Sequence, residues 1–213
     1  MSLPKILVTG FGPFPGAPKN PSALIALSLA QSKRMAHFAR VSAAVIPTAY
    51  GEIARLARLI EHEKPDAVLM FGLAGATPYL RIETCGRNRA SLFHADASRK
   101  KPSQTLLPNA PGVLRMRAPV RRLLQAARAS GLKARLSSDA GGYICNAAIF
   151  HALYTTHGKT SPLIAFVHIP WPRGRGKGRA GFISSRPAMA TLQRASEAIL
   201  RSEEHTSELQ SLV

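Results

Sequence analysis

The sequence predicts an α/β layered fold built around one core. Short apolar runs that stop at glycine or proline alternate with segments in which apolar residues recur at helical spacing. The connections between these segments are short in the first half of the chain. With 213 residues, of which 46% are hydrophobic and 19% charged, the chain has enough apolar material for a sizeable core.

The first half of the chain predicts three strands and two helices. The strands are expected at residues 5–9, 41–46 and 66–71, and their apolar runs end at Gly10, Pro47 and Gly72. A helix is expected after Asn20, because asparagine is a favoured N-cap and Pro21 suits the first helical position. A second helix is expected over 53–60, where apolar residues follow the i, i+3, i+4, i+7 rule.

The second half is less regular. Strands are expected at 80–84, 134–137 and 163–169, with 90–93 as a hairpin partner of the first. Helices are expected at 120–127, ended by Gly131, at 146–156, with Gly158 as C-cap, and near the C-terminus, where Met189, Leu192 and Ile199 share a face. Residues 94–112 and 172–181 are expected to form loops, and a loop as long as the first is often functional.

Composition restricts the location and the partners of the protein. No apolar run reaches the ~18 residues of a membrane span, and the N-terminus does not resemble a signal peptide. Two cysteines, Cys85 and Cys145, fit a reducing, cytoplasmic compartment better than a disulfide framework. The net charge is +18, and Asp96 and Asp139 are the only acidic residues within 84–196. No nucleic-acid recognition motif accompanies this charge, so a solvated basic surface is favoured over a nucleic-acid partner.

The chain is expected to form a single domain over residues 1–200. Residues 201–211 (RSEEHTSELQS) resemble the translation of a sequencing-adapter oligonucleotide, and they break the basic trend abruptly. Residues 201–213 are therefore interpreted as a non-native tail, and the alternative is an ordinary frayed C-terminus.

A glycine- and proline-rich turn, residues 10–16 (GFGPFPG), directly follows the first strand. A dinucleotide-binding loop needs glycine at its sixth position, which here is Pro15, so a nucleotide cradle is rejected. The turn instead presents Phe11 and Phe14 at the carboxyl end of a strand, where open α/β sheets bind ligands. The alternative is that both rings belong to the core.

Cys145 lies in a second turn, residues 138–146 (SDAGGYICN), which runs into a predicted helix. A thiol at a helix N-terminus is near the positive end of the helix dipole, which favours the thiolate. Backbone N–H groups at the same place can stabilise an oxyanion. The alternative is a buried cysteine that acts as a small hydrophobe.

His168 interrupts the apolar strand 163–169, just before Pro170 and Trp171. A histidine there is either satisfied by a buried partner or placed at a site. A cysteine–histidine pair needs a third group to orient the imidazole, and Glu83 is the candidate. The alternative for Glu83 is an ion pair with Arg81 or Arg87.

These segments together resemble the pyroglutamyl peptidase I (pyrrolidone-carboxylate peptidase) family of cysteine peptidases, over roughly residues 5–200. The N-terminal signature is similar to residues 8–14, with Gly16 and residues 20–22. The nucleophile motif S-x-x-A-G-x-[YF]-x-C-N matches at Ser138, Ala140, Gly141, Tyr143, Cys145 and Asn146. Residues 166–170 (FVHIP) match the histidine strand. The acidic motif G-x-A-x-x-R-x-x-I-x-x-E-x-x-A-x-N matches at Gly72, Ala74, Glu83 and Asn88.

The resemblance implies a three-layer α/β/α sandwich with a mixed, mostly parallel sheet. It also implies removal of N-terminal pyroglutamate from peptides by thiol acyl transfer, without a metal or other cofactor. The implied catalytic residues are Cys145 as nucleophile, His168 as base and acid, and Glu83 as the group that orients the imidazole. Phe11 and Phe14 are expected to sandwich the flat lactam, with Ile144 lining its pocket. Family members are often homotetramers.

Two family arginines are replaced in this chain. Thr77 stands at the arginine of the acidic motif, and Phe93 stands where members place an arginine about ten residues after the glutamate. Cys85 lies outside every motif and is expected to be structural. The alternative function is a catalytically impaired relative that binds pyroglutamyl or similar small acyl ligands.

Overall fold

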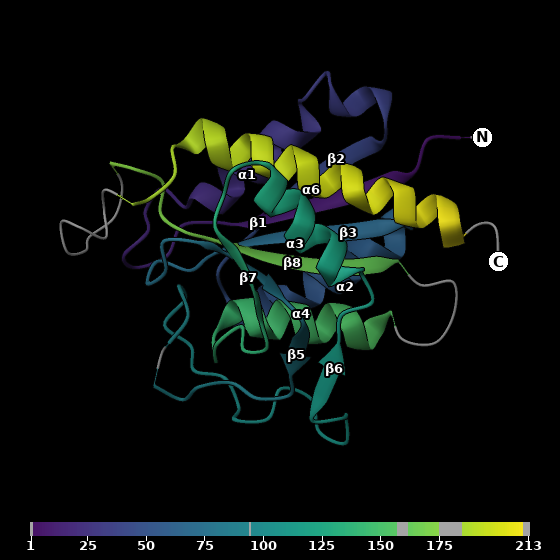
Figure 1. Ribbon diagram of the computed structural model, residues 1–213. Coiled ribbons are helices and arrows are strands. Elements are labelled where there is room, and N and C mark those ends of the chain that lie inside the picture. The colour runs from purple at the N-terminus through teal and green to yellow at the C-terminus, as the bar shows by residue number, and fades with distance from the viewer. Residues whose placement is uncertain (1, 94, 157–161, 175–184, 211–213) are drawn as a thin grey trace.

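The central element is a six-stranded sheet in the order β2-β1-β3-β8-β4-β7 (Figure 1). The structure is a computed structural model that describes residues 2–93, 95–156, 162–174 and 185–210, with side chains to residue 202 at its end. The strands are β1 (Lys5–Phe11), β2 (Arg40–Ile46), β3 (Ala67–Leu73), β4 (Leu80–Glu83), β7 (Ala134–Ser137) and β8 (Leu163–Ile169). Neighbours are parallel except β4 and β8, which are antiparallel. The predicted mixed, mostly parallel sheet is confirmed.

Helices cover both faces of this sheet, which gives the three predicted layers. One face carries α1 (Pro21–Ala30), α3 (Val120–Ala129) and α6 (Met189–Gln210), and the other carries α2 (Ile53–Glu63) and α4 (Ile144–Thr155) (Figure 1). Two short 3₁₀ helices, η1 (Met35–His37) and η2 (Tyr50–Glu52), flank β2. Each face buries its own apolar cluster against the sheet.

Alternation along the strands decides which side chains face α4. Successive strand residues point to opposite faces of a sheet. Val68 and Met70 of β3 and Phe166 of β8 pack into the cluster under α2 and α4. Gly72 and His168 follow in the same alternation, so they lie on the α4 face. On β4, Leu80 and Ile82 pack under the opposite helices, which places Arg81 and Glu83 on the α4 face as well.

The start of α1 is fixed by the cap that the sequence predicts. Asn20 is the N-cap, its Oδ1 accepts from the Ser22 N–H at 3.1 Å, and Pro21 is the first helical residue. Asn20 also donates from Nδ2 to the Gly12 carbonyl at 3.1 Å, and Ser22 Oγ accepts from the Phe11 N–H at 3.0 Å. The same residues that begin the helix therefore hold the turn after β1.

The predicted hairpin between 80–84 and 90–93 is wrong. The chain instead forms a separate two-stranded sheet, in which β5 (Cys85–Arg87) pairs antiparallel with β6 (Val113–Arg115). The backbone donors of Ala90 and Ser91 are used elsewhere, because they bond to the carbonyls of Gln104 and Gly142. Residues 95–112 contain no helix or strand, in agreement with the predicted loop. Gly158 and most of the 172–181 segment lie outside the described residues.

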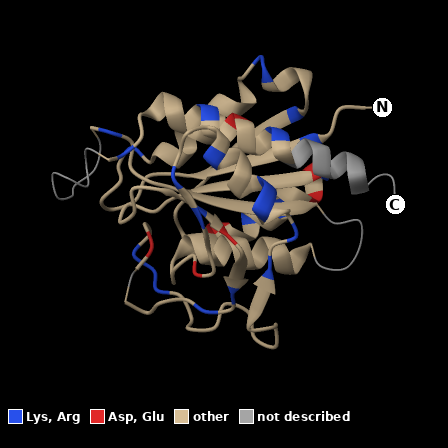
Figure 2. Cartoon of the chain, in the orientation of Figure 1, with Lys and Arg blue, Asp and Glu red and all other residues tan. Residues whose placement is uncertain are grey.

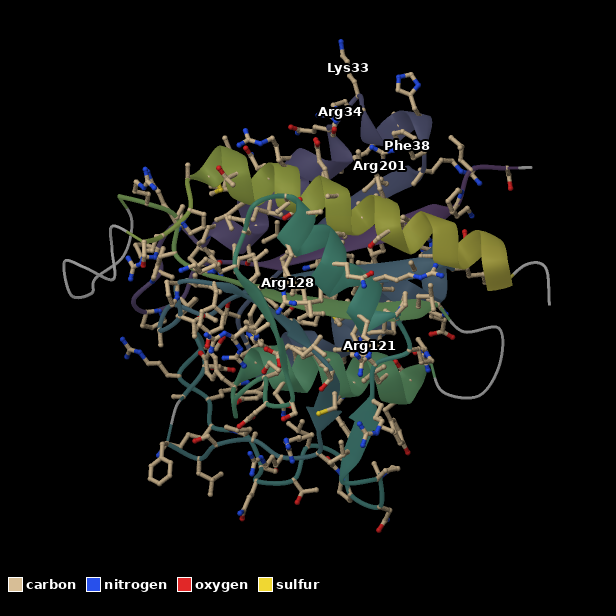
Figure 3. All side chains as sticks on the ribbon, viewed as in Figure 1. Lys33, Arg34, Phe38, Arg121, Arg128 and Arg201 are labelled. Carbon is tan, nitrogen blue, oxygen red and sulfur yellow. The ribbon has the colours of Figure 1, made fainter. Side chains whose placement is uncertain are left out.

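Helix α6 continues past residue 200 to Gln210. Its middle is attached to the segment around η1: the Arg201 guanidinium lies 4.3 Å from the ring centre of Phe38, and Arg34 pairs with Glu197 at 3.6 Å (Figure 3). The foreign origin of residues 201–213 stays a prediction. Among the described helices, none combines the length and the apolarity that crossing a bilayer requires.

Candidate active site

Glu83 and His168 meet on the α4 face of the sheet. In the antiparallel β4–β8 pair, Arg81 lies opposite His168, and Glu83 follows on the same face at the end of β4. His168 Nδ1 and Glu83 Oε1 are 2.7 Å apart. The two side chains are almost fully removed from solvent, with exposures of 4% and 0%. The predicted orienting pair is therefore formed in the interior.

Cys145 reaches the same place from α4. Gly72 of β3 is the register partner of His168 on the adjacent strand. A Cβ built on Gly72 would lie only 2.9 Å from Cys145 Sγ, so the sulfur rests directly over this glycine. Cys145 is partly buried and its thiol is free. The structure thus gathers the three predicted catalytic residues from β4, β8 and the first turn of α4.

The first turn of α4 presents backbone N–H groups beside Cys145. Tyr143 is the N-cap, with extended backbone and no side-chain capping bond. The first N–H groups of a helix have no acceptor within the helix, so those of Ile144 and Cys145 can serve a ligand. Asn146 fixes the turn from its other side: it accepts from the Arg87 N–H at 2.9 Å and donates to the carbonyls of Arg87 and Arg89, both at 2.8 Å.

Burial favours the neutral forms of both the thiol and the imidazole. Burial and, to a smaller extent, the charge of Glu83 raise the pKa of Cys145 to about 12, against opposing effects of Arg81 and the backbone. Burial also lowers the pKa of His168, although Glu83 acts to raise it. Desolvation and the nearby carboxylate therefore oppose the thiolate that the helix terminus is expected to favour.

Glu83 carries the negative charge of the site. Burial acts to raise its pKa, but the hydrogen bond and charge of His168, the Ser137 hydroxyl and the charge of Arg81 together lower it below the ordinary value. Arg81 Nη2 lies 2.9 Å from the same Oε1 that contacts His168. One oxygen, Glu83 Oε1, thus contacts both His168 and Arg81, as the two interpretations of Glu83 require.

The predicted substrate-binding residues are only partly accessible. Phe11 is 3% exposed and packs against Phe166 with ring centres 6.3 Å apart, and Ile144 is fully buried. Phe14 is partly exposed and lies 6.5 Å from the Tyr143 ring. Contact of these residues with a lactam stays a prediction.

Two features near Cys145 are not apparent from sequence reasoning. Tyr50 stands edge-on to Tyr143, with ring centres 6.1 Å apart, and its hydroxyl donates to the Gly142 carbonyl at 3.4 Å. Burial raises the pKa of Tyr50 to about 12, so its phenol is neutral. No sequence signal marks this residue, whereas Tyr143 belongs to the nucleophile motif. The second feature is Arg81, which the sequence suggests only as an ion-pair partner.

The residues that replace the two family arginines bring no charge to the site. Thr77 donates within its own turn, to the Ala74 carbonyl at 3.3 Å. Phe93 is 90% exposed. The described lysines and arginines are spread over helices and loops on both sides of the sheet (Figure 2). Within the described residues, no group of three or more His, Cys, Asp or Glu side chains is arranged to hold a metal ion.

Comparison with known proteins points to the pyroglutamyl peptidase family. Residues 4–201 match the sequence model of the pyroglutamyl peptidase family. The chain is 33% identical over 189 residues to a pyrrolidone-carboxylate peptidase of Thermococcus kodakarensis, covering 87% of this chain and 88% of the relative. It is 34% identical over 170 residues to one of Gloeobacter violaceus, covering 78% and 82%.

Solved structures agree with this assignment. The pyrrolidone carboxyl peptidase of Thermus thermophilus superposes with a TM-score of 0.77 at 27% identity, over 92% of this chain and 98% of that one. A mutant pyrrolidone carboxyl peptidase from P. furiosus superposes with a TM-score of 0.83 at 26% identity, over 98% and 100%.

Proposed function

Because the chain belongs to the pyroglutamyl peptidase family, we propose that it removes N-terminal pyroglutamate from peptides with Cys145, His168 and Glu83 as its catalytic residues. The observation that carries the proposal is the 2.7 Å contact between His168 and Glu83 on the face where Cys145 Sγ rests over Gly72. A thiol, a base and an oriented carboxylate are the parts that acyl transfer requires.

The tautomer of His168 follows from its partner. The ionised Glu83 accepts from Nδ1–H, so Nε2 is the basic nitrogen. Nε2 takes the thiol proton while Sγ attacks the pyroglutamyl carbonyl, and the tetrahedral oxyanion faces the first turn of α4. The imidazolium then protonates the leaving amine, and the C–N bond breaks to leave a thioester. Water, deprotonated by the same nitrogen, attacks the thioester and releases pyroglutamate and the thiol.

The deprotonation and the attack are coupled. A thiol with a raised pKa and an imidazole with a lowered one do not form a stable ion pair before substrate arrives. The negative charge instead passes from sulfur to the carbonyl oxygen, where N–H groups of the first turn of α4 stabilise it. Each such donor stabilises the transition state by about 3 kcal/mol in comparable sites.

The test is hydrolysis of a chromogenic L-pyroglutamyl amide under reducing conditions. We expect turnover by the wild type and none by Cys145→Ala. Cys85→Ala is the matched control, because Cys85 is the other free cysteine, but it is buried and its Sγ donates a hydrogen bond to the Ser138 carbonyl at 3.3 Å. Turnover by Cys145→Ala, or its loss in both variants, would contradict the mechanism. The comparisons do not favour the impaired relative that the sequence left open; tight product binding by a folded but inactive wild type would restore that alternative.

The proposal also includes a cellular location and an oligomeric state. A cytoplasmic enzyme is supported by the two free cysteines, and a homotetramer is supported by the family resemblance together with exposed apolar residues at Leu92, Phe93 and Val113. Light scattering tests the assembly, and a monomer at assay concentration would refute it. Phe11, Phe14 and Ile144 are proposed to bind the lactam; Phe14→Ala should raise KM more than it lowers kcat.

A further inference from the structure

The Arg81 side chain makes three polar contacts at the site. Its Nη2 contacts Glu83 Oε1 at 2.9 Å and Ser137 Oγ at 3.0 Å, and it also donates to the Asp139 carbonyl. The side chain is 22% exposed, so most of it is withdrawn from water. A charge-assisted contact to a fully buried carboxylate is stronger than an exposed ion pair.

The contacts of Arg81 link two parts of the proposed machinery. Ser137 ends β7, and Asp139 lies in the turn that leads to Cys145. Glu83 ends β4 and holds His168. One guanidinium therefore bridges the segment that carries the base's partner and the segment that delivers the nucleophile. The family's acidic motif leaves this position open, so the motif does not account for an arginine here.

We propose that Arg81 is a positioning residue for the reaction, which fixes the Glu83 carboxylate toward His168 and fastens the 137–139 turn to β4. This inference rests on the proposed function for its kinetic readout. Arg81 shares Oε1 with His168, so the carboxylate cannot rotate away from the imidazole without breaking an ion pair. Thr77 and Phe93 stand at the positions of the two family arginines. The cation that contacts Glu83 in this chain is Arg81.

The charge of Arg81 also acts on both proton carriers. It lowers the pKa of Cys145 and that of His168, against the opposite effect of Glu83 on each. The other titratable groups near Cys145 and His168 either contact a polar partner or are neutral. The Asp139 carboxylate lies 3.7 Å from Arg89, Arg87 donates to the Ser138 carbonyl, and Tyr50 and Tyr143 carry neutral phenols with raised pKa values.

The experiment compares Arg81→Met and Arg81→Lys with Arg135→Met. Arg135 is the register partner of Arg81 on β7 and lies over the Tyr79 ring at 4.6 Å. Its removal deletes the same charge one strand away from Arg81. In Arg81→Met we expect kcat to fall roughly 10- to 100-fold, the cost of a misplaced catalytic group, with KM little changed. We also expect the acid limb of kcat/KM to move to higher pH, because the His168 pKa rises when a nearby cation is lost.

Arg81→Lys separates charge from geometry. Lysine keeps the positive charge, but its shorter side chain does not place a nitrogen where Nη2 meets its three acceptors, so the acid limb should return toward the wild-type position while kcat recovers only in part. Equal effects in Arg81→Met and Arg135→Met would overturn the proposal, since they would indicate general charge rather than contact. Wild-type kcat and pH profile in Arg81→Met would overturn it as well. If that variant does not fold, an unchanged kcat in Arg81→Lys overturns the proposal in its place.

A second readout is independent of turnover. The rate at which iodoacetamide alkylates Cys145 at alkaline pH, corrected with Cys145→Ala for Cys85, reports the ionisation of the thiol. It should be lower in Arg81→Met than in the wild type and in Arg135→Met. If the wild type does not hydrolyse the pyroglutamyl amide, the proposed function fails, and the alkylation rates still decide the role of Arg81: equal rates refute it.

Discussion

Gly72→Ala should displace the nucleophile of an otherwise intact fold. The added Cβ would lie 2.9 Å from Cys145 Sγ, and 2.7 and 3.0 Å from Cζ and Cε1 of Phe166. Favourable contacts between such atoms begin near 3.5 Å, so the sulfur must retreat by roughly 0.6 Å or more. Because a shift of about 1 Å costs on the order of 100-fold in rate, we expect kcat/KM to fall by about 15- to 100-fold.

The stability of this variant should change less than its activity. Overpacking a core costs about 1–3 kcal/mol, and replacing glycine in a strand by alanine returns about 0.5–1 kcal/mol. The net loss is therefore about 0–2.5 kcal/mol, which leaves the protein folded at 25 °C if its stability is in the ordinary range. Urea unfolding gives the free energy, and hydrolysis of the pyroglutamyl amide gives kcat/KM on the folded enzyme.

Ala67→Val is the matched control for Gly72→Ala. Ala67 begins the same strand, is fully buried and packs in the cluster on the face opposite Cys145. Valine there should cost comparable stability and leave kcat/KM within about two-fold, because the nucleophile is untouched. The reasoning is refuted if Gly72→Ala retains wild-type kcat/KM, or if Ala67→Val loses as much activity at equal stability.

Four further results are expected. The acid limb of kcat/KM should lie below pH ~6.5, the ordinary value for histidine, because burial lowers the pKa of His168 and the base must be neutral; a higher midpoint contradicts this. Iodoacetamide should alkylate Cys145 slowly at pH 7 and faster as pH rises, since its pKa is about 12, and a fast plateau at neutral pH would disprove a resting thiol. Glu83→Gln should lower kcat by about 10²–10⁴-fold and move the acid limb to lower pH, because Glu83 raises the pKa of His168. An unchanged acid limb would show that Glu83 does not act on the ionisation of His168. Asn20→Ala should cost about 1–2 kcal/mol in urea unfolding with little effect on kcat, and a loss below ~0.3 kcal/mol would deny it the capping role.

The sequence predicts the regular parts of this fold well, for a local reason. The strand at 163–169 and the Asn20–Pro21 helix start appear as expected, because apolar runs and caps act on neighbouring residues. The hairpin partner at 90–93 is wrong because its backbone donors are used by distant carbonyls of Gln104 and Gly142, which no local pattern announces. Cys145, His168 and Glu83 come from motifs, and the fold brings them to one face.

The ionisation of the site was not predictable, since it depends on burial rather than on sequence spacing. A cysteine at a helix N-terminus suggests a thiolate, but the pKa of Cys145 is raised by desolvation and by Glu83. Arg81 shows the same limit. Its charge is visible in the sequence, but its three acceptors lie on β4, β7 and the turn after β7, which meet only in the folded sheet.

Glu83 has two opposite effects on the proposed reaction, and the arrangement of the site resolves them. Its charge raises the pKa of His168 and so strengthens the base, but it also raises the pKa of Cys145 and so weakens the nucleophile. Contact at 2.7 Å makes the first effect specific to the imidazole, since Glu83 hydrogen-bonds Nδ1 directly. Arg81, on the same oxygen, offsets part of the charge that reaches the sulfur. In the proposed reaction the carboxylate thereby orients the base, and the raised pKa of Cys145 favours loss of the thiol proton at the moment when an acyl carbonyl accepts the charge.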